Sequence, residues 1–82
     1  MTYLQRADKD GKTKAPYYYA VSEKKDETGR FETLCVFPNG MDIHFLSRGF
    51  FEPYIKITEK EFNAAKAAAQ HILDSFDTEK NL

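Results

Sequence analysis

Alternating apolar and polar residues predict three consecutive β-strands in the first half of the chain. The segments are rich in aromatic and β-branched residues and are separated by charged or glycine-containing stretches, which is typical of strands joined by hairpins. They cover residues 17–23 (YYYAVSE), 31–37 (FETLCVF) and 41–46 (MDIHFL). A fourth strand can form at YIKI, residues 54–57, and the neighbouring Pro53 limits it to the edge of the sheet.

The dipeptide Asn39-Gly40 predicts a tight type I′ turn between the second and third strands, because both turn positions need positive φ. This turn would place Cys35 directly opposite His44. Side chains alternate between the two faces of a strand, so this register groups one apolar set on the predicted core face: Leu34, Val36, Met41, Ile43 and Phe45. The second face then carries Phe31, Thr33, Cys35, Phe37, Asp42, His44 and Leu46.

A C-terminal helix is predicted from residue 58 to residue 76. Thr58 as N-cap, with Glu61 three residues later, forms the capping-box pattern that opens many helices. Apolar residues then recur on one stripe at helical spacing, namely Phe62, Ala65, Ala69, Ile72 or Leu73, and Phe76. The predicted fold class is therefore α+β: an antiparallel three- to four-stranded β-meander with one C-terminal helix packed on one sheet face.

The predicted domain organisation is simple. Residues 1–16 are polar, with KDGKTK in their middle, and are expected to form a flexible arm. Residues 17–76 form the single α+β domain, and residues 77–82 form a frayed tail. Two alternatives concern the face that the helix leaves open, because the arm could fold over it through Tyr3 and Leu4, or the segment GFFEPYIKI could pack there.

Composition narrows the functional classes. The chain has 82 residues, and its 12 basic and 13 acidic side chains give a net charge of −1. Cys35 is the only cysteine and cannot form an internal disulfide, which is typical of a reducing compartment. No apolar run approaches the roughly 20 residues that span a bilayer, and no signal peptide is visible. We therefore expect a soluble, cytoplasmic protein.

The open sheet face provides the main functional hypothesis. Val21 is the most apolar residue of its strand, which would place Tyr17 and Tyr19 with it on the core side and Tyr18 on the open face. A large uncovered apolar patch usually serves for binding, and aromatic residues dominate interface hot spots. The predicted partner-binding residues are Tyr18, Phe31, Cys35, Phe37 and His44.

The expected activity is that of a small non-enzymatic protein-binding module. Its partner would be another protein or a second copy of this chain, with no membrane, small-molecule substrate, metal or cofactor implied. A small, near-neutral chain without catalytic motifs also suits an accessory or inhibitor protein encoded by a phage or mobile element.

The alternative hypothesis is nucleic-acid binding through Lys12, Lys24, Lys25 and Arg48, which could converge at one end of the sheet. The strand order and the helix with AAKAAAQHIL, over residues 17–76, are loosely similar to the latter part of a double-stranded RNA-binding domain. They are also similar to the N-terminal DNA-binding domains of phage integrases. The paired lysines and the first helix of the RNA-binding domain are absent, and the near-neutral charge also counts against phosphate binding.

A third hypothesis is an enzyme in which His44 activates the Cys35 thiol. Directly opposed residues have Cβ atoms roughly 4.5–5.5 Å apart, close enough for an imidazole to lower a thiol pKa. The chain shows no orienting group, no oxyanion site and no histidine–cysteine spacing suited to zinc. The sequence therefore predicts that this protein is not an enzyme.

Overall fold

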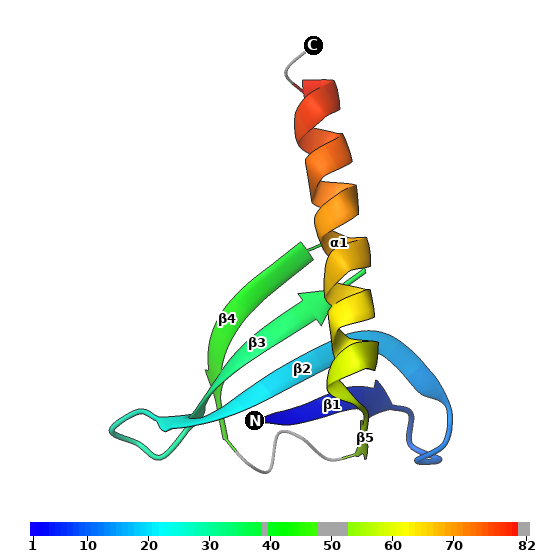
Figure 1. Ribbon diagram of the computed structural model, residues 1–82. Helices are drawn as coiled ribbons and strands as arrows, with labels where there is room; N and C mark the ends of the chain where they lie inside the picture. The colour runs from blue at the N-terminus through cyan, green and yellow to red at the C-terminus, as the bar shows by residue number, and fades with distance from the viewer. Residues whose placement is uncertain (39, 48–52, 81–82) are drawn as a thin grey trace.

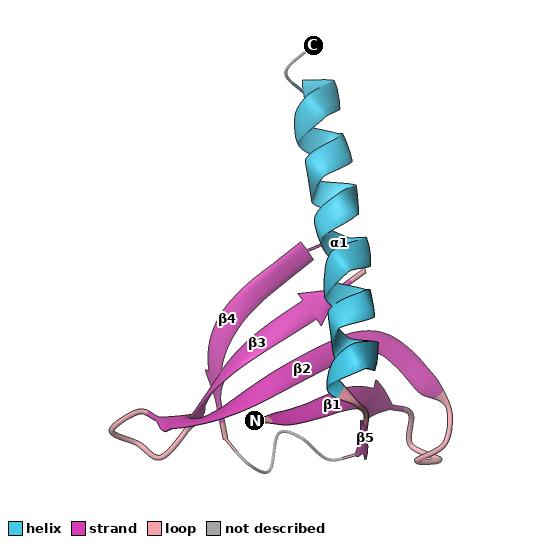
Figure 2. Cartoon of the chain, in the orientation of Figure 1, coloured by secondary structure: helices cyan, strands magenta, loops and turns pink. Residues whose placement is uncertain are grey.

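The computed structural model describes residues 1–38, 40–47 and 53–80, the last five of these by their backbone only. Its elements, in chain order, are β1 (Thr2–Ala7), β2 (Lys14–Lys25), β3 (Phe31–Phe37), β4 (Gly40–Leu46), β5 (Tyr54–Lys56) and α1 (Glu59–Lys80). The strands form one antiparallel sheet in the order β4-β3-β2-β1-β5, and α1 lies across one face and extends past the sheet (Figures 1 and 2). The α+β class is confirmed, whereas the predicted strand number was too low. The strand predicted at YIKI is β5, which pairs with β1 and does not continue the predicted meander beside β4.

The additional strand is β1, in the segment that we expected to be a polar arm. It pairs with β2 on one side and with β5 on the other. The KDGKTK stretch is the hairpin turn between β1 and β2, closed by the Asp8 amide, which donates to the Thr13 carbonyl at 2.8 Å. Within the turn, the Asp10 carboxylate accepts from the amides of Lys12 and Thr13, and Gly11 takes the positive φ that the turn requires.

The register between β3 and β4 differs by two residues from the predicted one. Phe37 faces Gly40, Val36 faces Met41, and Cys35 faces Asp42 instead of His44. Gly40 begins β4 and does not have positive φ, so the type I′ turn at Asn39-Gly40 is wrong. Asn39 itself lies outside the described residues. A shift of two changes every partner but no face, so the two predicted groups of side chains on these strands remain correct.

The two faces of β2 were assigned the wrong way round. Tyr18 faces Val36 and Ala20 faces Leu34, so both lie on the helix side of the sheet. Tyr19 faces Cys35 on the opposite side, and Val21 shares that side. The apolar character of Val21 misled the prediction because both faces of this sheet bury side chains.

The main core lies between α1 and the sheet. Its buried members are Ala20, Val36, Phe62 and Ala69, and six half-buried side chains pack against them: Tyr3, Tyr18, Leu34, Met41, Ile57 and Ala65. Small Ala20 and Ala69 leave room for the ring of Phe62, which lies 5.4 Å from the ring of Tyr3. The predicted helix stripe is correct through Ala69. Of the two alternatives that follow, Ile72 is exposed and Leu73 is half-buried, and the side chain of Phe76 is outside the described set.

The start of α1 was predicted correctly, and its end was not. The Glu61 amide donates to the Thr58 hydroxyl at 3.1 Å, and the Thr58 amide donates to the Glu61 carboxylate at 3.2 Å, which is the reciprocal capping box. The helix then continues to Lys80 rather than fraying after residue 76.

Candidate protein-interaction surface

The face opposite α1 holds most of the predicted partner-binding residues. Phe31, Cys35, Phe37 and His44 project to this side, as their common register shows. Tyr18 does not, because it lies on the helix side of β2 and packs against the main core. The place expected for Tyr18 is taken by Tyr17, whose ring meets that of Phe37 at 5.9 Å in an edge-to-face arrangement.

The centre of this face is a second, smaller core. Cys35 is 2% exposed and Thr33 is fully buried, although α1 covers only the other side. Tyr54 of β5 packs its ring edge-on against Tyr19 at 5.3 Å. Burial, followed by the charge and hydrogen bond of Tyr54, raises the pKa of Tyr19. The expectation of an open aromatic face is therefore wrong at its centre, and Tyr54 belongs to the GFFEPYIKI segment that we had considered as a cover.

The accessible part of this face is the rim around its buried centre. A cavity of about 190 Å³ is lined by Tyr19, Cys35, Phe37, His44 and Leu46. Arg6 lies over the ring of Tyr17 at 5.6 Å, and the Lys25 ammonium lies 5.0 Å from the ring centre of Phe31. These long basic side chains reduce the aromatic surface that a partner could contact.

The geometry does not support a Cys35–His44 nucleophile. Cys35 faces Asp42, and His44 faces Thr33. Burial, followed by the charge of Asp42, raises the pKa of the Cys35 thiol to about 11. The His44 imidazole instead has its Nε2 3.4 Å from Asp42 Oδ2 on the same strand. A buried thiol that resists ionisation is the opposite of an activated cysteine.

The predicted basic cluster is not brought together. Lys12 lies in the turn before β2, while Lys24 and Lys25 end this 12-residue strand, so the two groups occupy opposite ends of β2. The Lys24 ammonium is 3.4 Å from a carboxylate oxygen of Glu32. Arg48 lies outside the described residues.

Among the side chains that the structure describes, the exposed large apolar ones lie elsewhere, at Met1, Ile43, Phe45 and Ile72. Ile43 is 61% exposed and Phe45 is 41% exposed, and both project from β4 on the helix side. The helix crosses the strands obliquely and contacts β1, β2, β3 and β4 (Figure 1). It packs against the half-buried Met41 at the start of β4 and leaves Ile43 and Phe45 exposed.

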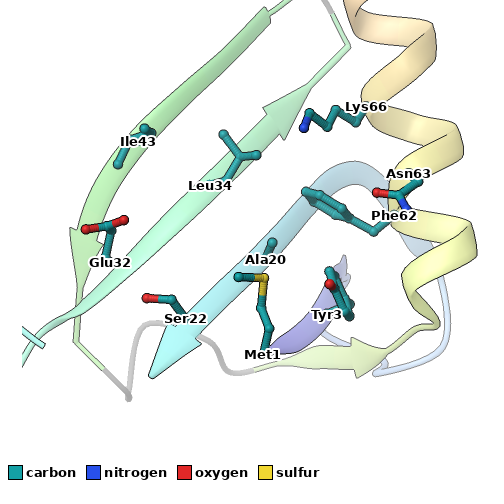
Figure 3. Close-up of a pocket in the computed structure, with 10 residues that line it drawn as sticks. All are labelled: Met1, Tyr3, Ala20, Ser22, Glu32, Leu34, Ile43, Phe62, Asn63 and Lys66. Atoms are coloured by element: carbon teal, nitrogen blue, oxygen red, sulfur yellow. The ribbon is translucent and has the colours of Figure 1, made fainter. Parts of the chain in front are cut away.

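Ile43 also borders a hollow between α1 and the sheet (Figure 3). The hollow has a volume of about 260 Å³ and is lined by Met1, Tyr3, Ala20, Ser22, Glu32, Leu34, Ile43, Phe62, Asn63 and Lys66. Figure 3 shows Ile43 and Leu34 on the strands, with Phe62 and Lys66 reaching from the helix on the other side. The exposed apolar surface of β4 thus continues into a groove beside the helix.

The outer edge of β4 is open as well. Within the described part of the chain, β4 pairs only with β3. The Ile43 amide donates to its neighbour's carboxylate, Asp42 Oδ1, at 2.8 Å. This amide therefore points away from the ladder with β3 and toward the edge. We refer to this edge together with the side chains of Ile43 and Phe45 as the β4 surface.

The sequence assigned Ile43 and Phe45 to the core and so missed the β4 surface. Their face was correctly predicted, but burial also depends on where along β4 the helix crosses the sheet. The stripe of α1 could be predicted from the sequence, but the angle at which the helix crosses the sheet could not, and this angle decides which part of β4 is covered.

Comparison with known proteins gives no match to a family model, a curated protein or a solved structure. No described helix is both long enough and apolar enough to cross a membrane. Across residues 1–38, 40–47 and 53–80, no group of three or more His, Cys, Asp or Glu residues could hold a metal ion.

Proposed function

We propose that this protein is a non-enzymatic protein-binding module that contacts its partner through the β4 surface. The observation that carries the proposal is the exposure of Ile43 and Phe45 on a strand that ends the sheet. An unpaired strand edge offers backbone hydrogen bonds, and adjacent apolar side chains supply burial on contact, which together form the requirements for strand addition by a protein partner.

The charge distribution also favours a protein partner. The basic residues considered for nucleic-acid binding lie at opposite ends of β2, and Lys24 is paired with Glu32. Net charge is −1, so counterion release from phosphates would contribute little affinity. On the β4 surface itself, Asp42 adds a negative charge that would repel a phosphate backbone.

The proposal can be tested by photo-crosslinking in the cells that express the protein. A photoreactive phenylalanine analogue replaces Ile43 in one variant and Ala67, an exposed residue of α1, in the control. We expect irradiation to attach a protein to position 43 but not to position 67, and this adduct to survive nuclease treatment. Equal adducts at both positions, or an adduct that nuclease removes, would contradict the proposal.

A further inference from the structure

We propose that the occupant of the β4 surface is a second copy of this chain, whose β4 pairs antiparallel with the first. The two-fold axis passes beside Ile43, so that the two five-stranded sheets become one continuous sheet. This inference rests on the proposed function and names the partner. Three features of the chain support it, namely the direction of the edge amide, the charges along β4 and the position of α1.

The backbone of β4 is suited to such pairing. In an antiparallel ladder, the amide and carbonyl groups of alternate residues point to opposite sides of the strand. The Ile43 amide points to the open edge, where Asp42 Oδ1 accepts its hydrogen at 2.8 Å. Because this direction alternates from one residue to the next, the backbone groups of Met41 and Phe45 also point to the open edge. In the dimer, the Ile43 amide donates instead to the carbonyl of the partner's Ile43, and the Asp42 carboxylate turns away.

The charges on β4 select this register. With Ile43 opposite the partner's Ile43, Asp42 lies opposite the partner's His44, and the symmetric pair repeats on the other side of the axis. The same two side chains already meet within one chain, where Nε2 and Oδ2 are 3.4 Å apart and form an ion pair when the imidazole is protonated. Moving the axis to Asp42 would oppose two carboxylates, which is destabilising, and moving it to His44 would leave both carboxylates facing Leu46.

The apolar side chains fit the same register. On the helix side of the sheet, the exposed Ile43 meets its counterpart, and the exposed Phe45 meets the partner's Met41. Because the paired strands are antiparallel, the two Met41 ends, where α1 covers β4, lie at opposite ends of the new ladder. The two helices therefore lie on one face at opposite ends of the ladder, as expected for an isologous two-fold interface.

The test is sedimentation equilibrium of the full chain and of charge-exchanged variants. We expect a wild-type dimer, about tenfold weaker dimerisation in His44→Asp because two carboxylate pairs then face each other, and recovery in the double variant Asp42→His/His44→Asp. Ile43→Lys should abolish the dimer, because it places a charge on each side of the axis. Ala67→Lys is the control and should dimerise like the wild type.

The outcomes separate the two proposals. A wild-type chain that stays monomeric at every concentration, or a dimer indifferent to these substitutions, overturns pairing with a second copy. If position 43 then crosslinks a different protein, the protein-binding proposal still stands. A dimer that is weakened by His44→Asp and is not restored by the double variant also overturns the proposed register. Circular dichroism of each variant shows whether it is folded.

Discussion

At the residue scale, the least expected feature is the buried polar and weakly polar centre of the face opposite α1. Thr33 is fully buried there, and its hydroxyl donates to the Phe31 carbonyl at 3.1 Å. Cys35 lies beside it, and its thiol meets the Thr33 carbonyl at 3.9 Å. These small side chains satisfy their hydrogen-bonding groups locally, so they can be buried without a partner from a second layer.

Cys35 provides a direct test of this burial. With its pKa raised to about 11 from an ordinary value of 9.0, its thiolate fraction near neutral pH is about a hundredfold lower than that of a free thiol. We expect the folded protein to react with a thiol reagent at least that much more slowly than a model thiol. The urea-unfolded chain serves as the control and should react at the ordinary rate. Rapid labelling of the folded chain would contradict the burial of Cys35.

The raised pKa of the Cys35 thiol also leads us to expect a loss of stability at alkaline pH. Because the pKa of Cys35 is higher in the folded state than in the unfolded chain, its contribution is complete below pH 9 and declines as pH rises from 9 to about 11. The raised pKa of Tyr19 acts in the same direction above pH 10. Urea unfolding of the wild type and of Cys35→Ala across this range should show a shallower decline for the variant.

At the residue scale, the sequence predicted the faces of the side chains on β3 and β4 correctly and their cross-strand partners incorrectly. Faces on β3 and β4 were correct because side-chain alternation is a local property of each strand. The cross-strand partners were wrong because they depend on which two residues form the turn. The dipeptide Asn39-Gly40 favoured a turn at these two residues, whereas Phe37 pairs with Gly40. The Cys35–Asp42 pair therefore replaces the Cys35–His44 pair on which the enzyme hypothesis depended.

At the element scale, α1 was predictable at its start because capping is decided within four residues. Thr58 and Glu61 satisfy each other's backbone amides, and Phe62 begins the buried stripe immediately afterwards. Strand β1 was not predictable in the same way. Tyr3 and Leu4 are adjacent and face opposite sides of a sheet that packs on both faces, so no apolar–polar alternation appears in the sequence.

The helix cap gives the element-scale prediction. Thr58→Ala removes the hydroxyl that accepts the Glu61 amide and should lower the free energy of unfolding by about 1 kcal/mol. Thr58→Ser keeps the hydroxyl and should remain close to the wild type. Chemical denaturation measures both variants. Equal stability of the alanine and serine variants would mean that α1 does not depend on this cap.

At the scale of the whole molecule, one helix crosses the sheet obliquely and packs against the end strand β4 at its start, near Met41 (Figure 1). The core therefore forms over the middle of the sheet, among Ala20, Val36 and Phe62, and the end strand β4 retains exposed apolar side chains. The sequence predicted that some apolar surface would remain uncovered, and it placed this surface on the wrong side. The reason is that side chains on the second face pack against one another, as Tyr54 of the edge strand β5 does against Tyr19, which only the five-stranded arrangement reveals.

The central claim is that association occurs along β4. The most direct test follows the backbone amide resonances of the isotope-labelled chain by NMR through a wide dilution series. We predict that the amides of Met41, Ile43 and Phe45 change most with concentration, while those of β5 and of Ala67 on α1 stay constant. Concentration-dependent shifts centred on β5 or around Phe37 on the face opposite α1, or no dependence on concentration at all, would contradict the claim.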